Sequence, residues 1–152
     1  MPLTASNCRL RKGRTSLPNQ IYILTCATNQ RRIVFNNWRL GRMLANQFRQ
    51  AEEAGFITSL AWVVMPDHFH WLIQLHHGTL GQLMCRVKSR SSKSINERMA
   101  TQGRLWQRGY HDRAVRREED VKVAARYIVT NPLRAGLVKK IGDYPLWDAI
   151  WL

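Results

Sequence analysis

The chain has 152 residues, 45% of them hydrophobic, and this length and composition fit a single globular domain with a sizeable core. Lysine and arginine number 24 against 10 aspartates and glutamates, which gives a formal net charge of +14 and predicts a polyanionic partner. Nucleic acid is favoured over a membrane, because no run is apolar enough to span one and no lysine-rich amphipathic helix stands out.

The first segment, residues 1–19, is polar and basic and predicts an N-terminal arm in front of a single domain at residues 20–152. Its basic side chains are candidates for contacts with DNA phosphates, and a solvated tail is an equally good interpretation: Arg9, Arg11, Lys12 and Arg14. There is no apolar leader, and three cysteines form no even set, so we expect reduced thiols in the cytoplasm, with the protein associated with the nucleoid.

Alternating and helical patterns divide the first half of the domain. A β-prone run predicts a strand at 21–28, and Asn36 is a candidate cap for a helix that ends at Gly55. Leu40, Leu44 and Phe48 recur there at helical spacing. Two further apolar runs around a Pro-Asp turn predict a β-hairpin, with strands at 57–65 and 68–75.

The second half begins with a helix predicted at 80–99, interrupted near Ser91. Its basic residues lie off the apolar stripe and are candidates for phosphate contacts, a solvated helix face being the alternative: Arg86, Lys88, Arg90 and Lys93. A short strand follows at 113–116, then a helix that begins at the acidic run from Glu118 and ends at Asn131, before Pro132. The closing segment carries Trp147, Ile150 and Trp151 at helical spacing, and we expect it to pack on the core.

The predicted order is β-α-β-β-α-β-α. This order indicates an α+β fold, an antiparallel β-sheet with helices packed on it, in a ferredoxin-like arrangement. Because this fold serves many functions, the function has to be argued from individual side chains.

Two histidines occupy alternate positions in the second hairpin strand. His68 and His70 therefore point to one face of the sheet, while Phe69 and Trp71 point to the other, into a core. Two imidazoles at this spacing on a rigid strand can hold one metal ion. For a His-x-His pattern taken alone, two strand-end histidines in water are the more common case.

The last helix adds two further groups. Tyr127 and Asn131 are four residues apart, so they can share a helix face. If that face looks onto the histidines, the Asn131 amide oxygen is a third ligand and Tyr127 is a nucleophile that attacks a metal-polarised phosphate. Nitrogen ligands mixed with neutral oxygen suit Mg²⁺ or Mn²⁺, and Zn²⁺ is an alternative.

Three segments resemble a known family. Met65–Leu72 resembles the HUH motif (histidine, hydrophobic, histidine) of single-tyrosine transposases, and Trp106–Arg113 resembles the segment that follows it in that family. Tyr127–Val138 resembles the family's tyrosine helix. The combination is most similar to the REP-associated tyrosine transposases, which are encoded beside repetitive extragenic palindromes, and the resemblance extends from about Ile21 to Trp147.

The resemblance implies an HUH domain with a defined chemistry. His68, His70 and Asn131 would bind the metal, and Tyr127 would form a 5′-phosphotyrosine link to single-stranded DNA and free a 3′-hydroxyl. The implied substrate is a single-stranded palindrome folded into a hairpin, with a guide sequence on its 5′ side. We expect a monomer or homodimer, and Arg108 and Arg126 complete the candidate DNA contacts.

Two other functions are consistent with the same residues. A basic domain that binds structured nucleic acid without cutting it would need neither Tyr127 nor the histidines. A metal-dependent nuclease that uses water as nucleophile would survive the loss of Tyr127. Tyr110, in the loop before the fourth strand, is the rival nucleophile, although no ligand stands four residues after it.

Overall fold

The computed structural model describes residues 16–151. The basic side chains predicted for the N-terminal arm therefore lie outside the described residues: Arg9, Arg11, Lys12 and Arg14. The boundary between arm and domain stays a prediction. No helix within the described range is long and apolar enough to cross a membrane.

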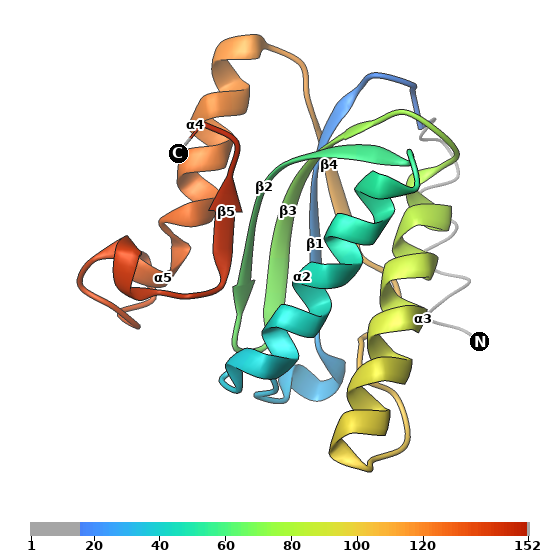
Figure 1. Cartoon of the computed structure of the whole chain (residues 1–152). Helices are drawn as coiled ribbons and strands as arrows, with labels where there is room; N and C mark the ends of the chain where they lie inside the picture. The colour runs from blue at the N-terminus through green and yellow to red at the C-terminus, as the bar shows by residue number, and fades with distance from the viewer. Residues whose placement is uncertain (1–15, 152) are drawn as a thin grey trace.

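In this part of the chain, five strands form one antiparallel sheet in the order β4-β1-β3-β2-β5 (Figure 1). The strands are β1 (Ile21–Ala27), β2 (Ile57–Met65), β3 (His68–Leu75), β4 (His111–Val115) and β5 (Trp147–Ala149). The first four strands and the two helices between them follow the ferredoxin-like β-α-β-β-α-β pattern. The predicted α+β fold is therefore confirmed, with a fifth strand added beside β2.

Helices α2 (Trp38–Glu53) and α3 (Leu80–Met99) lie side by side on one face of the sheet (Figure 1). The cap of α2 is Asn37, one residue later than predicted, and its Oδ1 accepts a hydrogen bond from the Arg39 amide at 3.0 Å. Phe48 of α2 stacks on Trp71 of β3, with ring centroids 4.2 Å apart, in the larger hydrophobic core.

Helix α3 is continuous, so the interruption predicted near Ser91 was wrong. Ser91 is fully buried, and its hydroxyl accepts a hydrogen bond from the Trp106 indole nitrogen at 3.0 Å. That bond satisfies the hydroxyl inside the core. Met99, the last residue of α3, is exposed.

Helices α4 (Glu118–Val129) and α5 (Asn131–Arg134) lie on the opposite face of the sheet (Figure 1). Apolar residues of α4, among them Ala125 and Ile128, form a second core with Leu72 of β3 and with residues of β2. The helix ends at Val129, two residues before the predicted end, because Pro132 has no N–H to continue the hydrogen-bond ladder. Asn131 therefore begins a separate turn.

The closing segment forms a strand, which corrects the packing expected from the helical spacing of its large residues. Strand β5 pairs with β2; Ala149 in the strand and Leu146 just before it are buried, and Trp147 packs against the core beneath α4 as expected. Ile150 and Trp151 are instead 61% and 40% exposed. Pairing prevails because β2 would otherwise leave the amides and carbonyls of its outer edge without strand partners.

Tyr144 ties the segment before β5 to the sheet. Its hydroxyl donates a hydrogen bond to the Val64 carbonyl at 2.6 Å, and the Val64 amide donates to Leu146 O at 2.9 Å. Burial raises the pKa of Tyr144 from 10.0 to about 12, because the phenolate would lose water. Tyr144 therefore packs against the sheet and acts as a neutral donor.

Tyr144→Phe should lower the free energy of unfolding by about 1 kcal/mol at neutral pH, because one half-buried hydrogen bond is lost. Urea unfolding of the two proteins measures the difference.

The difference between parent and variant should shrink as pH rises. The folded-state pKa of Tyr144 is about 12 against 10.0 ordinarily, so the contribution is complete below pH 10 and is lost on approaching pH 12, where the unfolded tyrosine has ionised first. A difference that stays constant across this range would contradict a neutral, buried donor.

Candidate active site

Strand β3 places the two histidines on the sheet face that α4 covers. Phe69 and Trp71 are fully buried in the core beneath α2 and α3, whereas Leu72 belongs to the core beneath α4. Because side chains alternate, His68 and His70 share the side of Leu72, as predicted. Their ring centroids are 4.9 Å apart and the ring planes meet at 81°.

Each histidine is oriented through its Nδ1 atom. His68 Nδ1 lies 2.7 Å from Asp67 Oδ1, and a carboxylate only accepts, so this nitrogen carries the hydrogen. His70 Nδ1 lies 2.8 Å from the hydroxyl oxygen of Thr25, its register partner on β1. When Nδ1 donates, the Nε2 lone pairs of both rings are left for a metal, as in most protein metal sites.

Asp67 does more than form the hairpin turn that was predicted for it. Its second carboxylate oxygen, Oδ2, makes an ion pair with Arg31 Nε at 3.0 Å. Arg31 thus fixes the carboxylate that fixes His68.

Electrostatics keep His70 neutral. Burial first, and then electrostatic interaction with His68, Arg134 and Arg31, lowers its pKa from 6.5 to about 4. An imidazole with this pKa is unprotonated at neutral pH, and the unprotonated ring is the form that binds a metal.

Tyr127 is on α4 and is 64% exposed, so its hydroxyl can meet a large substrate. The guanidinium carbon of Arg134 lies 3.7 Å from the centroid of its ring. Since Arg134 also acts on the charge of His70, it connects the tyrosine to the histidine side of the sheet. The rival, Tyr110, packs against the core under α2 and α3, on the other side of the sheet, and this favours Tyr127.

The donor set fits a divalent metal only with help from oxygen. The described residues contain no group of three or more His, Cys, Asp or Glu side chains that could hold a metal ion. Two imidazoles must therefore be supplemented by a neutral oxygen, and Asn131, half-buried at the start of α5, is the candidate from the sequence. Such a mixed set suits Mg²⁺ or Mn²⁺. The ligand roles of His68, His70 and Asn131 stay predictions.

The candidate DNA contacts do not form one patch. Arg86 and Lys88 lie on α3, where Lys88 Nζ donates to the carbonyls of Gln107 and Gly109 at 2.7 and 2.9 Å. Lys88 therefore holds a loop of its own chain, next to the half-buried Arg108. Arg90 and Lys93 are exposed on the same helix.

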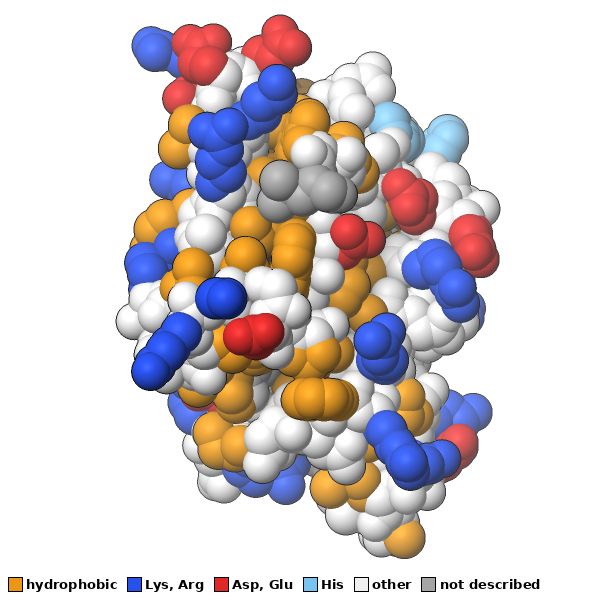
Figure 2. All heavy atoms as spheres, turned by 60° about the vertical axis from the view of Figure 1, so that its left-hand side comes forward, with side chains coloured by type: hydrophobic (Ala, Val, Ile, Leu, Met, Phe, Trp, Pro, Cys, Tyr) orange, Lys and Arg blue, Asp and Glu red, His pale blue; other side chains and the backbone are white. Residues whose placement is uncertain are grey.

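Arg126 lies on α4, on the opposite side of the sheet from α3. Figure 2 brings the α4, α5 and β5 side forward, and Lys and Arg side chains follow its left-hand and lower margins, with hydrophobic atoms exposed between them. Basic side chains therefore occur on both faces of the protein.

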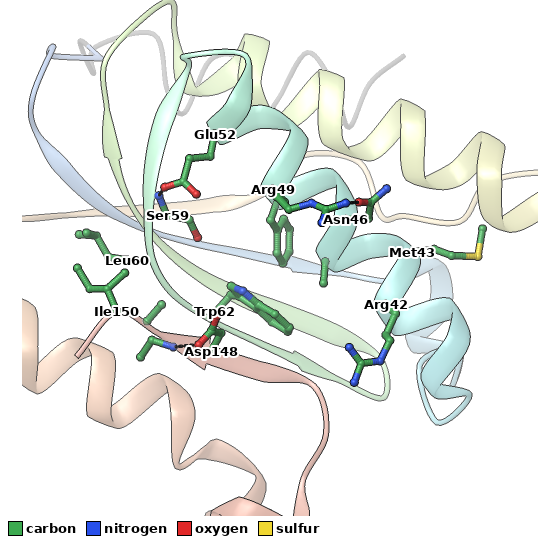
Figure 3. Close-up of a pocket in the computed structure, with 14 residues that line it drawn as sticks. Arg42, Met43, Asn46, Arg49, Glu52, Ser59, Leu60, Trp62, Asp148 and Ile150 are labelled. Atoms are coloured by element: carbon green, nitrogen blue, oxygen red, sulfur yellow. Dashed lines mark hydrogen bonds between the residues drawn. The ribbon is translucent and has the colours of Figure 1, made fainter. Parts of the chain in front are cut away.

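A pocket of about 700 Å³ lies between α2 and the β2–β5 edge, and no sequence pattern predicted it (Figure 3). Trp62 lies against Phe48 of α2, with ring centroids 5.8 Å apart, so the pocket is on the face opposite the histidines. Arg42 and Asp148 line its two sides. No sequence pattern pointed to Thr25 or Arg134 either, because their contacts appear only in the folded chain.

Residues 16–131 match the family model described as "Transposase IS200 like". The chain belongs to this family. Two curated relatives are a REP-associated tyrosine transposase of Escherichia coli (strain K12), 29% identical over 87 residues, and a putative REP-associated tyrosine transposase of Haemophilus influenzae, 26% identical over 116 residues. The matches cover 56% and 66% of this chain. They confirm the resemblance to REP-associated tyrosine transposases that the sequence motifs indicated.

This chain spans 50% and 65% of the length of those two relatives. Among solved structures, it resembles a REP-associated tyrosine transposase bound to a REP hairpin, with a TM-score of 0.73 and 22% identity over 88% of this chain and 79% of the other. A putative transposase of Deinococcus radiodurans matches with a TM-score of 0.53 and 21% identity over 76% and 93%. These likenesses establish a shared fold.

Asp67→Asn keeps the size of the side chain but removes the charge that orients His68, so the affinity for Mn²⁺ should fall about ten- to a hundred-fold. Titration calorimetry with Mn²⁺ measures the affinity. Glu97→Gln, which removes an exposed carboxylate from α3, is the charge-matched control and should bind as the parent does. An unchanged affinity in Asp67→Asn would show that the histidines need no such orientation.

Proposed function

We propose that this protein is a single-stranded DNA endonuclease and strand-transferase that cleaves hairpin DNA of the REP type. The reaction would proceed through a covalent 5′-phosphotyrosine at Tyr127, with Mg²⁺ or Mn²⁺ bound by His68, His70 and Asn131. The observation that carries this proposal is the pairing of two Nδ1-anchored histidines with an exposed tyrosine on the helix that covers their sheet face.

The chemistry assigned to Tyr127 is a phosphoryl transfer. Its Oη attacks the scissile phosphorus and loses its proton to solvent, while the bond from phosphorus to the 3′-oxygen breaks and that oxygen takes a proton from solvent and leaves as a 3′-hydroxyl. The 5′ end stays on the tyrosine, and attack by another 3′-hydroxyl reverses the steps and joins strands. A divalent ion, when bound, supplies Lewis-acid polarisation of a phosphate oxygen.

The histidines and the helix contribute positioning. Thr25 and Asp67 hold the imidazoles, so the ligand nitrogens need no reorganisation when a metal arrives. The buried apolar side of α4 anchors this helix in the second core, so the backbone of Tyr127 is held in a fixed position. Holding reacting groups in place supplies much of the rate gain in phosphoryl transfer.

The substrate proposal rests on charge and on relatives. A chain of net charge +14 favours polyanions, and one protein of the same fold is described as bound to a REP hairpin. A protein that acts on such chromosomal palindromes would work in the cytoplasm at the nucleoid.

Tyr127→Phe should abolish both cleavage and the covalent adduct, because the nucleophilic oxygen is gone. A denaturing gel of protein incubated with labelled single-stranded hairpin DNA and Mn²⁺ detects both products. The side chain is exposed, so the free energy of unfolding should change by no more than about 0.5 kcal/mol.

Tyr110→Phe is the matched control for that experiment and should form adduct at the parent rate. Cleavage by Tyr127→Phe that leaves a free 5′-phosphate would identify water as the nucleophile. No cleavage by the parent under any divalent metal, together with tight hairpin binding, would favour a binding module.

Hairpin DNA with a single-stranded 5′ flank should bind more tightly than a blunt duplex of equal length. If about six phosphates are contacted, the affinity should fall about a thousand-fold between roughly 50 and 200 mM salt, because bound counterions are released. Fluorescence anisotropy with the two DNAs over a salt series measures both effects. Equal affinities for the two DNAs would contradict a hairpin substrate.

A further inference from the structure

Arg134 holds the backbone of the tyrosine's helix end. It lies on α5, and its Nη2 donates to the Tyr127 carbonyl at 2.5 Å while its Nη1 donates to the Thr130 hydroxyl at 2.6 Å. Thr130 in turn donates to the Arg126 carbonyl at 2.7 Å. The guanidinium is thereby fixed across the break between α4 and α5.

The same guanidinium covers the ring of Tyr127. Its carbon lies 3.7 Å from the ring centroid, close enough for a cation–π contact. A tyrosine that is 64% exposed would otherwise be free to change rotamer. Arg134 therefore restricts the ring of the proposed nucleophile.

Arg134 still has N–H donors that could bind a ligand. Of the five N–H donors in a guanidinium, Nη1 and Nη2 have each used one on their own chain. The residue is exposed, so its other donors can reach an incoming group. Its positive charge also acts on His70, on the sheet below. A phosphate between Tyr127 and the histidines would therefore lie within reach of this cation.

We propose that Arg134 positions Tyr127 for attack and donates a hydrogen bond to a non-bridging oxygen of the scissile phosphate. The proposal deepens the proposed function and rests on it. An arginine suits the task better than a lysine, because its planar guanidinium can stack on a ring, donate to a carbonyl and a hydroxyl, and still contact a phosphate.

The test measures single-turnover adduct formation with saturating hairpin DNA and Mn²⁺ for the parent, Arg134→Ala, Arg134→Lys and Lys139→Ala. Lys139→Ala removes one exposed positive charge nearby in the sequence and should react as the parent does. Arg134→Ala should be slower by about a hundred-fold. Its affinity for the hairpin should stay within a few-fold of that of Lys139→Ala, because the loss concerns one phosphate.

Sulfur substitution at the scissile phosphate separates direct contact from a structural role. In the parent, each of the two phosphorothioate diastereomers should react more slowly than the normal phosphate. For the diastereomer whose sulfur replaces the oxygen that Arg134 contacts, this slowing should be smaller or absent in Arg134→Ala. Arg134→Lys keeps the charge but not the fork, so it should recover only part of the rate. Added guanidinium ion at millimolar concentration should raise the rate of Arg134→Ala and not that of Tyr127→Phe.

The outcomes distinguish this inference from the proposed function. If the parent forms no adduct, the proposed function fails. If the parent forms adduct and Arg134→Ala matches Lys139→Ala, the role of Arg134 is wrong while the function stands. Sulfur effects that are identical in parent and Arg134→Ala would overturn the phosphate contact. If Arg134→Ala were to unfold, the same comparison would be made with Arg134→Lys.

Discussion

The two-residue alternation of β3 is the constraint on which the rest of the structure depends. β3 lies between β1 and β2, so both of its edges are paired and its side chains are directed strictly to one face or the other. Phe69 and Trp71 anchor the layer of α2 and α3, while His68 and His70 are left for the layer of α4 and α5. A shift of one residue in the strand would exchange core and site.

Two arginines contribute to the lowered pKa of His70, although the proposed cofactor is itself a cation. Arg31 and Arg134 both act on His70, and Asp67 is the carboxylate that contacts His68. A metal bound by two neutral imidazoles would therefore meet repulsion in the protein alone. DNA would relieve it, since a phosphate between metal and arginine is attracted to both. In the proposed mechanism, metal and substrate thus reinforce each other's binding.

Local patterns were sufficient to predict the first four strands, the ferredoxin-like order and the shared face of His68 and His70, because these follow from side-chain period and turn residues. They were not sufficient for contacts between distant segments, such as Thr25 with His70 or Lys88 with the carbonyls of a loop. A positive charge in a sequence does not reveal whether it faces solvent or its own chain. The helical spacing around Trp147 misled because pairing with β2 outweighed it.

The added strand β5 also bears on how the protein behaves in concentrated solution. β2 is nine residues long and largely apolar, and β5 with its flanking residues covers it from the Leu60 carbonyl to the Val64 amide. A long, bare apolar edge is a template on which other chains add as strands, the first step of aggregation. β5 itself is only three residues long and carries the charged Asp148, so the edge it presents is short and poorly suited to such growth.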